Sequence, residues 1–200
     1  MEQTDSVLRD RRSLVHGVRD ETRKETGATG RIASMASAVF SDKADAVRRQ
    51  VLGPIGFWFF LWKELPLGAF AGLKLRSLDE GGCTVILRGG WRTQNPFRST
   101  YFAAQSMAAE MSTGAPTMVL VRGCDAKISM LVTDIRGRFT KKIAGESQFT
   151  FREIGEMAAT IERAAVTGEP ATFVARSVGR NAEGAVASEF EVTWSFKRRD

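Results

Sequence analysis

Apolar residues are spaced differently in successive parts of this 200-residue chain. Residues 1–30 are dominated by charged side chains, which predicts a solvated helix or a disordered arm. In residues 32–50 apolar side chains recur at helical spacing. Residues Pro54–Leu65 are apolar at almost every position, so we expect a short helix that ends before Pro66. This helix is expected either to pack in the core or to contact a membrane surface.

The chain after Leu73 has the short runs typical of a β-sheet. Two runs that flank the turn residues Asp79–Gly82 predict a β-hairpin. Further strands are predicted at residues 117–121, 128–132, 135–142, 172–178 and 186–196. Before the last two strands, residues 153–167 have helical spacing and predict an amphipathic helix that Gly168 closes. Strands and helices do not alternate as in a parallel sheet, so the order indicates an antiparallel α+β domain.

The stretch Trp91–Gly114 predicts the helix around which the domain is built. Proline is tolerated in a first helical turn, so after Asn95-Pro96 we expect a helix from about Phe97 to Gly114. Most residues in its middle are Ala, Ser or Met on every face, which favours a helix buried all round. Glu110 is the exception, because a buried carboxylate needs either a partner or a chemical role.

Composition narrows the classes of function. The net charge of +6 favours anionic partners, and the two cysteines, Cys83 and Cys124, are too few for a disulfide framework and are expected to be inert. The only histidine, His16, lies in the charged N-terminal stretch, so a serine–histidine–aspartate triad or a histidine zinc site is not expected. No apolar run is long enough to span a bilayer, and no secretory signal is evident, so we expect a cytoplasmic protein.

The residues around the predicted central helix resemble those of hotdog-fold acyl-CoA thioesterases. The phenylacetyl-CoA thioesterase-like branch carries Asn-x-x-Gly-x-x-His-Gly-Gly, followed by Leu-Ala-Asp/Glu on its central helix. This chain reads Asn-Pro-Phe-Arg-Ser-Thr-Tyr-Phe-Ala from Asn95, and then Ala-Ala-Glu at the same spacing, ending at Glu110. Arg98 replaces the family's first glycine, Tyr101 its histidine, and Phe102-Ala103 its glycine pair. The match is closer still to an uncharacterised branch, a domain of unknown function grouped with these proteins, in which an extra helix precedes the last two strands.

This resemblance covers about Leu52 to Phe196 and implies the fold and the assembly. We expect a hotdog fold for residues 52–200, with an antiparallel sheet wrapped around a central helix, and a charged extension, partly helical or disordered, for residues 1–51. Tyr101 and Glu110 are nine residues apart and project from nearly opposite faces of a helix. A homodimer or higher oligomer is therefore expected, because hotdog domains form a pocket from the helix start of one chain and the carboxylate of the other.

The resemblance also implies roles for individual residues. Glu110 would be the general base or nucleophile, and Asn95 would contact the thioester. Tyr101 and Arg98 would bind substrate, and the basic residues Arg136, Arg138 and Lys142 would bind the phosphates of a coenzyme A or carrier arm. Other interpretations are that Asn95 is only a capping or turn residue, that Glu110 pairs with an arginine across a subunit interface, that Tyr101 only packs and that the basic residues form a solvated face.

Three hypotheses of function follow. The first is hydrolysis of an acyl-CoA or acyl-carrier thioester, a small-molecule substrate whose coenzyme A moiety is the only cofactor group expected. The second is a hotdog protein that binds acyl or lipid-like ligands without turnover. The third is a scaffold whose basic arm contacts nucleic acid or acidic membrane, although no specific nucleic acid is expected. The matching positions of Asn95 and Glu110 favour the first hypothesis.

Overall fold

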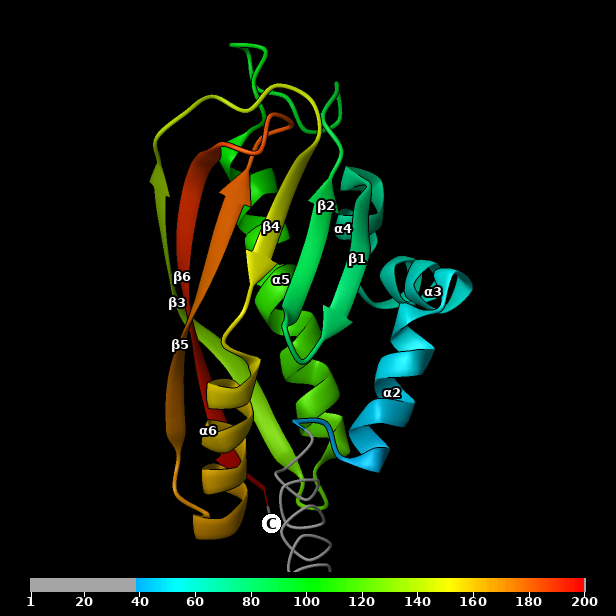
Figure 1. Cartoon of the computed structure of the whole chain (residues 1–200), viewed down its shortest axis with the longest axis vertical. Coiled ribbons are helices and arrows are strands. Elements are labelled where there is room, and N and C mark those ends of the chain that lie inside the picture. The colour runs from blue at the N-terminus through cyan, green and yellow to red at the C-terminus, as the bar shows by residue number, and fades with distance from the viewer. Residues whose placement is uncertain (1–38, 200) are drawn as a thin grey trace, which may run out of the picture. The chain divides into compact units, whose positions relative to one another are not determined.

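The computed structural model describes residues 39–199, which belong to one compact unit (Figure 1). The predictions for residues 1–30, including His16, lie outside the described residues, whereas the segment predicted at helical spacing in 32–50 is described from residue 39 and is helical from Asp42. The helices are α2 (Asp42–Leu52), α3 (Pro54–Glu64), α4 (Pro66–Ala71), α5 (Phe102–Gly123) and α6 (Ile154–Thr167). The strands are β1 (Leu73–Asp79), β2 (Gly82–Leu87), β3 (Ile128–Phe139), β4 (Ser147–Phe151), β5 (Ala171–Arg180) and β6 (Val186–Arg198).

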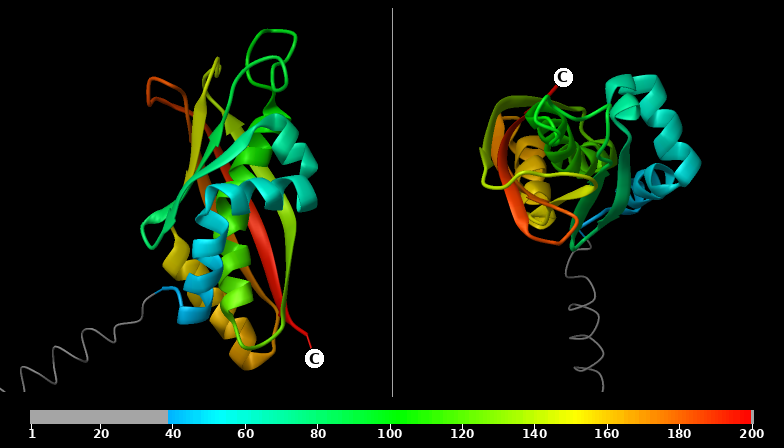
Figure 2. Two further views of the ribbon diagram at one scale, coloured as in Figure 1. Left: turned by 90° about the vertical axis from the view of Figure 1, so that its right-hand side faces the viewer. Right: turned by 90° about the horizontal axis from the view of Figure 1, so that it is seen from above.

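All six strands form one antiparallel sheet in the order β1-β2-β4-β5-β6-β3. The sheet curves around α5, which lies on its concave side, as the view along the helix shows (Figure 2). The inner face of the sheet and the facing side of α5 form the core, whose largest fully buried side chains include Phe149, Phe151, Phe190 and Phe196. The predicted α+β class and the sheet around a central helix are therefore confirmed.

The bounds predicted for the central helix are wrong at both ends. The helix begins at Phe102 rather than near Phe97, because the side chain of Asn95 holds residues 97–99 in a turn and Arg98 is left-handed, with φ of 55°. At the other end, the helix continues through Gly114 and Pro116 to Gly123. The predicted strand at 117–121 is thus helical. A short run of apolar residues does not distinguish a buried strand from a buried helix, and here burial outweighs the helix-breaking tendency of proline.

The two strands predicted at 128–132 and 135–142 are one strand, β3, which ends at Phe139. A bulge at Thr133 interrupts its pairing with β6, so the inward-facing positions change parity along the strand. Residues Thr140–Glu146 form a loop, so Thr140 and Lys142 do not share a strand face with Arg136 and Arg138, as the sequence suggested.

The other predicted elements are present. The hairpin β1–β2, the amphipathic helix α6 and the last two strands lie where the sequence places them. Helix α2 packs against the end of α5, where the Gly123 backbone approaches Ala44. Helix α3 matches the apolar run at residues 54–65, but only Phe57 and Leu61 are buried in the core. Among the described residues, no helix is long and apolar enough to cross a membrane.

Candidate functional site

The loop before α5 and the loop after β3 enclose a pocket of about 540 Å³. The two loops are tied together because the Thr100 N–H donates to the Ile143 carbonyl over 2.8 Å. The Tyr101 N–H donates to the Thr93 carbonyl over 2.7 Å, which fixes the point where the helix begins. The pocket is lined by Asn95, Pro96, Phe97, Ser99, Thr100, Tyr101, Phe102, Gln105, Phe139, Thr140, Lys141, Lys142 and Ile143. Three of the predicted site residues, Asn95, Tyr101 and Lys142, therefore meet in one place.

Of the two polar atoms of the Asn95 amide, only Oδ1 forms hydrogen bonds within its own loop. Its Oδ1 atom accepts from the Phe97 N–H at 3.0 Å, and from the N–H and the hydroxyl of Ser99, both at 3.2 Å. Asn95 is thus a turn residue, as one of the two interpretations of the sequence holds. Its Nδ2 group donates no hydrogen bond to the described residues, so it can still donate to a ligand.

Arg98 occupies the position of the family's glycine and adopts a backbone conformation that glycine favours. Its φ of 55° lies in the left-handed region, which glycine enters at no steric cost. A glycine would therefore adopt the backbone conformation of Arg98 without strain. The Arg98 side chain is exposed and does not line the pocket.

The start of α5 presents unpaired donors beside the pocket. The N-cap residue Tyr101 makes no side-chain capping bond, and within residues 39–199 no acceptor is found for the N–H groups of Phe102 and Ala103. These are the free amide groups that every helix start carries, together with the positive end of the helix dipole. The Tyr101 ring, which is 46 % exposed, packs edge-on against Phe102 with centroids 4.7 Å apart.

Gln105 is a site residue that the sequence reasoning missed. It is buried and lines the pocket, and its Nε2 group donates to the Thr100 carbonyl over 3.1 Å. Its Oε1 atom is buried and has no hydrogen-bond partner among the described residues. A buried acceptor without a donor is costly, so this oxygen is suited to accept a hydrogen bond from a ligand. The sequence shows only that Gln105 is a second long polar side chain in a stretch rich in alanine and methionine, and the unpaired oxygen is a property of the folded chain.

Glu110 lies more than two turns along α5 and is not part of this pocket. It belongs to a half-buried row at helical spacing, which we call the open stripe: Ala103, Met107, Glu110, Gly114 and Met118. Most other residues of the helix are buried, although Phe102 at its start and Arg122 in its last turn are exposed. The expectation of a helix buried all round is therefore wrong along this stripe.

The surroundings of the Glu110 carboxylate are apolar. The carboxylate lies over Gly114, where a Cβ atom would be 2.8 Å from its Oε1 atom and 3.3 Å from the Trp194 ring. Trp194 Nε1 donates to the Thr113 hydroxyl at 3.0 Å, which in turn donates to the Glu110 carbonyl at 2.9 Å. The ion pairs formed within residues 39–199 do not include Glu110. Burial therefore raises the pKa of the Glu110 carboxyl above its ordinary value.

The open stripe lies beside the edge strand β3, whose inner face is also uncovered. Ile135 and Gly137 pair with the buried residues Val192 and Phe190, so they face α5. Ile135 and Phe139 are nevertheless 43 % and 46 % exposed, because no strand continues the sheet beyond β3 within the described chain.

Arg136 and Arg138, the other two basic residues of the predicted site, lie on the outer face of the sheet. Arg136 and Arg138 pair in register with Glu191 and Glu189, and Arg136 forms an ion pair with Asp134 over 2.9 Å. These guanidinium groups thus do not join the pocket. A contact between them and a substrate stays a prediction, and it requires a ligand that reaches the outer face.

The two cysteines show no sign of reactivity. Cys83 is fully buried in β2, and burial, together with the charge of Asp79, raises the pKa of its thiol well above its ordinary value. Cys124 follows α5 and is half-buried, and burial raises its pKa as well. Among residues 39–199, no group of acidic, cysteine or histidine side chains is arranged to hold a metal ion.

Comparison with known proteins supports the fold. No protein-family model matches this chain, and no curated protein sequence does either. A protein of unknown function from Chlorobaculum tepidum is similar in structure, with a TM-score of 0.62 and 15% sequence identity over 74% of this chain and 98% of its own. A protein of unknown function from Pseudomonas aeruginosa, a probable thioesterase, gives 0.60 and 17% over 73% and 97%.

A thioesterase of Staphylococcus aureus, seen as a glutamine-to-alanine variant, gives a TM-score of 0.51 and 12% identity over 66% of this chain and 98% of its own. These neighbours are of the hotdog thioesterase type, so the described chain has the hotdog fold that the motif implied.

Proposed function

We propose that this protein hydrolyses an acyl thioester carried by coenzyme A or by an acyl-carrier arm. The observation that supports this proposal most is the Glu110 carboxylate, which lies in an apolar, half-open environment without a cation from its own described chain. A carboxyl group in such surroundings has a raised pKa, which suits a general base near neutral pH. It is also accessible, because the stripe on which it lies is not fully covered.

The active form in this proposal is a homodimer. From Tyr101 to Glu110 the helix rises about 14 Å, at 1.5 Å per residue, so the pocket and the carboxylate of one chain cannot act on one thioester. The uncovered edge of β3 and the open stripe lie together, and a second copy placed there would cover both. A long unpaired edge strand is a site at which another strand is readily added. Such a dimer would bring the pocket of one protomer near Glu110 of its partner.

In this proposal each pocket residue binds a different part of the substrate. The Phe102 and Ala103 N–H groups and the Asn95 Nδ2 group are donors for the thioester carbonyl, whose oxygen gains negative charge as water attacks. The Gln105 Oε1 atom would accept from an amide N–H of the carrier arm, and Lys142 would hold a phosphate. The acyl chain would lie along the uncovered inner face of β3, beside the open stripe.

A specific feature favours binding without turnover as the second candidate. Where the family has a histidine, this chain has Tyr101, whose ring is partly exposed and packs on Phe102. A phenol hydroxyl can donate a hydrogen bond to a ligand, but it does not replace histidine as a general base. If Glu110 is only a buried anion, the same pocket and the uncovered face of β3 would still bind an acyl group.

One feature of a neighbour bears on this choice. In the Staphylococcus aureus protein, the residues changed to alanine in separate structures are a glutamine and a glutamate fifteen positions apart. Asn95 and Glu110 have the same separation in this chain. Chemically related side chains therefore occur at matching spacing, which supports a thioesterase role for Asn95 and Glu110.

The test is a hydrolysis screen over short, long and aromatic acyl-CoAs, with ligand binding measured on the same samples. Glu110→Gln keeps the shape of the side chain and removes its charge, so turnover should fall on the order of 10²-fold or more while acyl-CoA binding persists. Glu156→Gln, at an exposed position of α6, is the matched control and should retain full turnover. No hydrolysis by the wild type, combined with acyl-CoA binding, would favour the binding protein. Unchanged turnover in a folded Glu110→Gln variant would refute the role of this carboxylate.

A further inference from the structure

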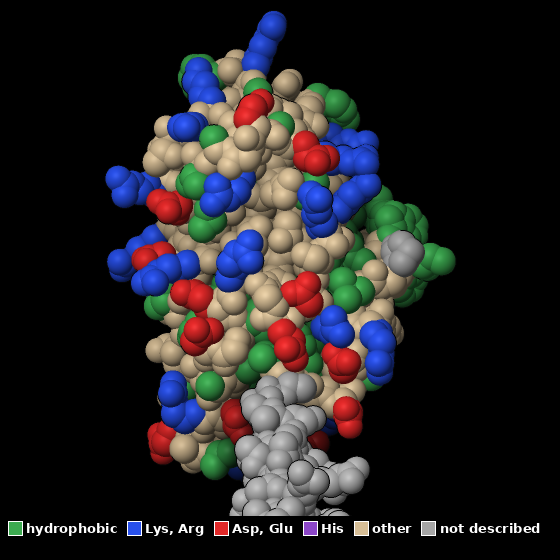
Figure 3. Space-filling view, viewed as in Figure 1, with side chains coloured by type: hydrophobic (Ala, Val, Ile, Leu, Met, Phe, Trp, Pro, Cys, Tyr) green, Lys and Arg blue, Asp and Glu red, His purple; other side chains and the backbone are tan. Residues whose placement is uncertain are grey.

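Helices α3 and α4 carry a cluster of uncovered aromatic and aliphatic side chains, which Trp91 from the loop after β2 extends. We call this cluster the aromatic face and define it as Ile55, Trp58, Phe59, Trp62, Phe70 and Trp91, which are each between 46% and 81% exposed. In the space-filling view it is the green projection formed by α3 (Figure 3). Soluble proteins seldom expose apolar patches of more than a few hundred Å² without a binding role.

The sequence of α3 indicates an apolar environment on both sides of the helix. Phe57 and Leu61 are buried against the domain, while Trp58, Phe59 and Trp62 are each more than half exposed. A helix that is apolar all round is normally buried all round, whereas a surface helix has a polar outer side. The outer side of α3 therefore requires another apolar phase or partner.

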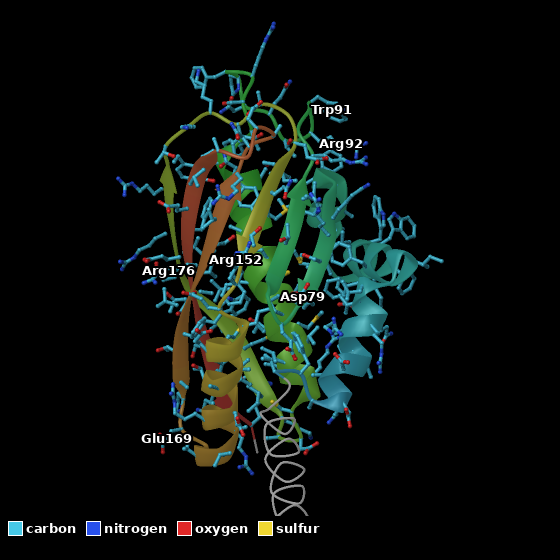
Figure 4. All side chains as sticks on the ribbon, viewed as in Figure 1. Asp79, Trp91, Arg92, Arg152, Glu169 and Arg176 are labelled. Atoms are coloured by element: carbon cyan, nitrogen blue, oxygen red, sulfur yellow. The ribbon has the colours of Figure 1, made fainter. Side chains whose placement is uncertain are left out.

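The charges around the aromatic face are almost all positive. Lys74, Arg88 and Arg92 line a groove of about 770 Å³ beneath it, together with the rings of Trp58, Trp62 and Trp91. Lys63 adds a fourth cation on α3, where its Nζ atom lies 3.3 Å from the Glu64 carboxylate. Trp91 and Arg92 project side by side near α4 (Figure 4), and the Arg92 guanidinium lies 5.8 Å from the Phe70 ring centroid.

This combination matches the surface of an anionic bilayer. Tryptophan is enriched where lipid headgroups meet hydrocarbon, because its ring is apolar and its N–H group is polar. Lysine and arginine next to such rings extend their charges to lipid phosphates. The 11 residues of α3 span about 17 Å, too short to cross a bilayer, so the helix would lie in the interface.

We propose that the aromatic face docks this protein on membranes that contain anionic phospholipid. The face adjoins β1, at the opposite edge of the sheet from β3. It would therefore remain open in a dimer formed at the β3 edge, and the proposal stands independently of the catalytic function. An anionic bilayer accounts for both the tryptophans and the cations, whereas a second copy of this basic face would bring like charges together.

The test is co-sedimentation of the full chain with vesicles of phosphatidylcholine, alone or mixed with phosphatidylglycerol in a two-to-one ratio. The wild type should bind the mixed vesicles more strongly, with a blue-shifted tryptophan emission, and added salt should weaken binding. Trp58→Ser/Trp62→Ser should lower the partition coefficient about tenfold or more, because binding scales with the apolar area inserted. Lys63→Glu/Lys74→Glu should lower it about tenfold on the mixed vesicles.

Matched controls carry the same changes elsewhere. Val166→Ser/Val174→Ser removes two exposed apolar side chains from α6 and β5, and Arg163→Glu/Lys197→Glu reverses two exposed charges. Both should bind within about twofold of wild type. Every variant keeps residues 1–38, so any contribution of that segment is common to all.

Three results would overturn the proposal. The first is that the wild type binds neither kind of vesicle. The second is that the double tryptophan variant binds the mixed vesicles as strongly as the wild type does. The third is that this variant sediments as a smaller species than the wild type when no vesicles are present. The last result would assign the aromatic face to contact between copies of this chain.

Discussion

Gly114 provides a way to move the Glu110 carboxylate without removing it. A Cβ atom added at Gly114 would lie 2.8 Å from Glu110 Oε1 and 3.3 Å from Trp194 ring carbons. The carboxylate is the end of a flexible side chain and can rotate away, whereas the ring of Trp194 is buried and is held by its hydrogen bond to Thr113. Gly114→Ala should therefore displace the proposed base and strain its packing.

The change in the free energy of unfolding caused by Gly114→Ala follows from two opposing effects. Alanine is about 1 kcal/mol more favourable than glycine inside a helix, and overpacking a core position costs about 1–3 kcal/mol. The sum predicts a loss of stability of about 0–2 kcal/mol, or roughly 0–8 °C in the melting temperature of a domain this size. Gly155→Ala is the matched control, because it lies in α6 with nothing within 4 Å of the added atom. That variant should gain about 0.5–1 kcal/mol.

The assay pairs urea denaturation with turnover of the best acyl-CoA substrate. The difference in stability between the two glycine variants isolates the overpacking term, which should be about 1–3 kcal/mol. Turnover should fall at least tenfold in Gly114→Ala and stay unchanged in Gly155→Ala, because about 1.4 kcal/mol of lost transition-state stabilisation is tenfold in rate. Equal stability of the two variants together with full turnover in Gly114→Ala would refute the described geometry of Glu110.

Three further predictions concern single positions. Because burial raises the pKa of Glu110 above its ordinary value of 4.5, the folded state keeps this proton at a pH where the unfolded state has lost it. The free energy of unfolding of the wild type, measured by urea titration, should therefore decline relative to that of Glu110→Gln as pH rises above about 4.5. A rise in this free energy instead would indicate that a partner subunit supplies a cation to Glu110. Gly123→Ala would place its Cβ atom 2.8 Å from the Ala44 Cα atom, so it should displace α2. The free energy of unfolding in urea should fall by about 1–3 kcal/mol. An unchanged midpoint of unfolding would mean that α2 is not packed tightly against α5. Arg98→Gly should leave stability equal or up to about 1 kcal/mol higher, whereas Arg98→Val should lower it by about 1 kcal/mol or more, and the opposite order in thermal melts would argue against a left-handed residue 98.

The fold was predictable where local patterns are distinctive, and the central helix shows where they are not. The hairpin β1–β2 has a strong turn signal, and α6 has apolar residues at helical spacing with a closing glycine, so both were placed well. Gly114 and Pro116 are local signals for a helix end, yet the helix continues for nine residues beyond Gly114. The deciding factor is tertiary, because Ala115, Thr117 and Val119 are buried and the Thr117 hydroxyl lies 2.9 Å from Met157 Sδ of α6. Such contacts between distant segments leave no local trace in the sequence.

The candidate site divides along the same line. The spacing of Asn95 and Glu110 is a property of the sequence alone, and it indicated both residues before any geometry was known. Arg98, by contrast, has a left-handed backbone with φ of 55°, which its residue type does not indicate, because residues other than glycine rarely adopt it. Gln105 was overlooked because its importance comes from an unpaired buried oxygen, which exists only once the helix start and the loop to Ile143 are assembled around it. Of the two, Gln105 is the more informative position for substrate identity, because an acceptor buried in the pocket selects ligands that carry a donor at that point.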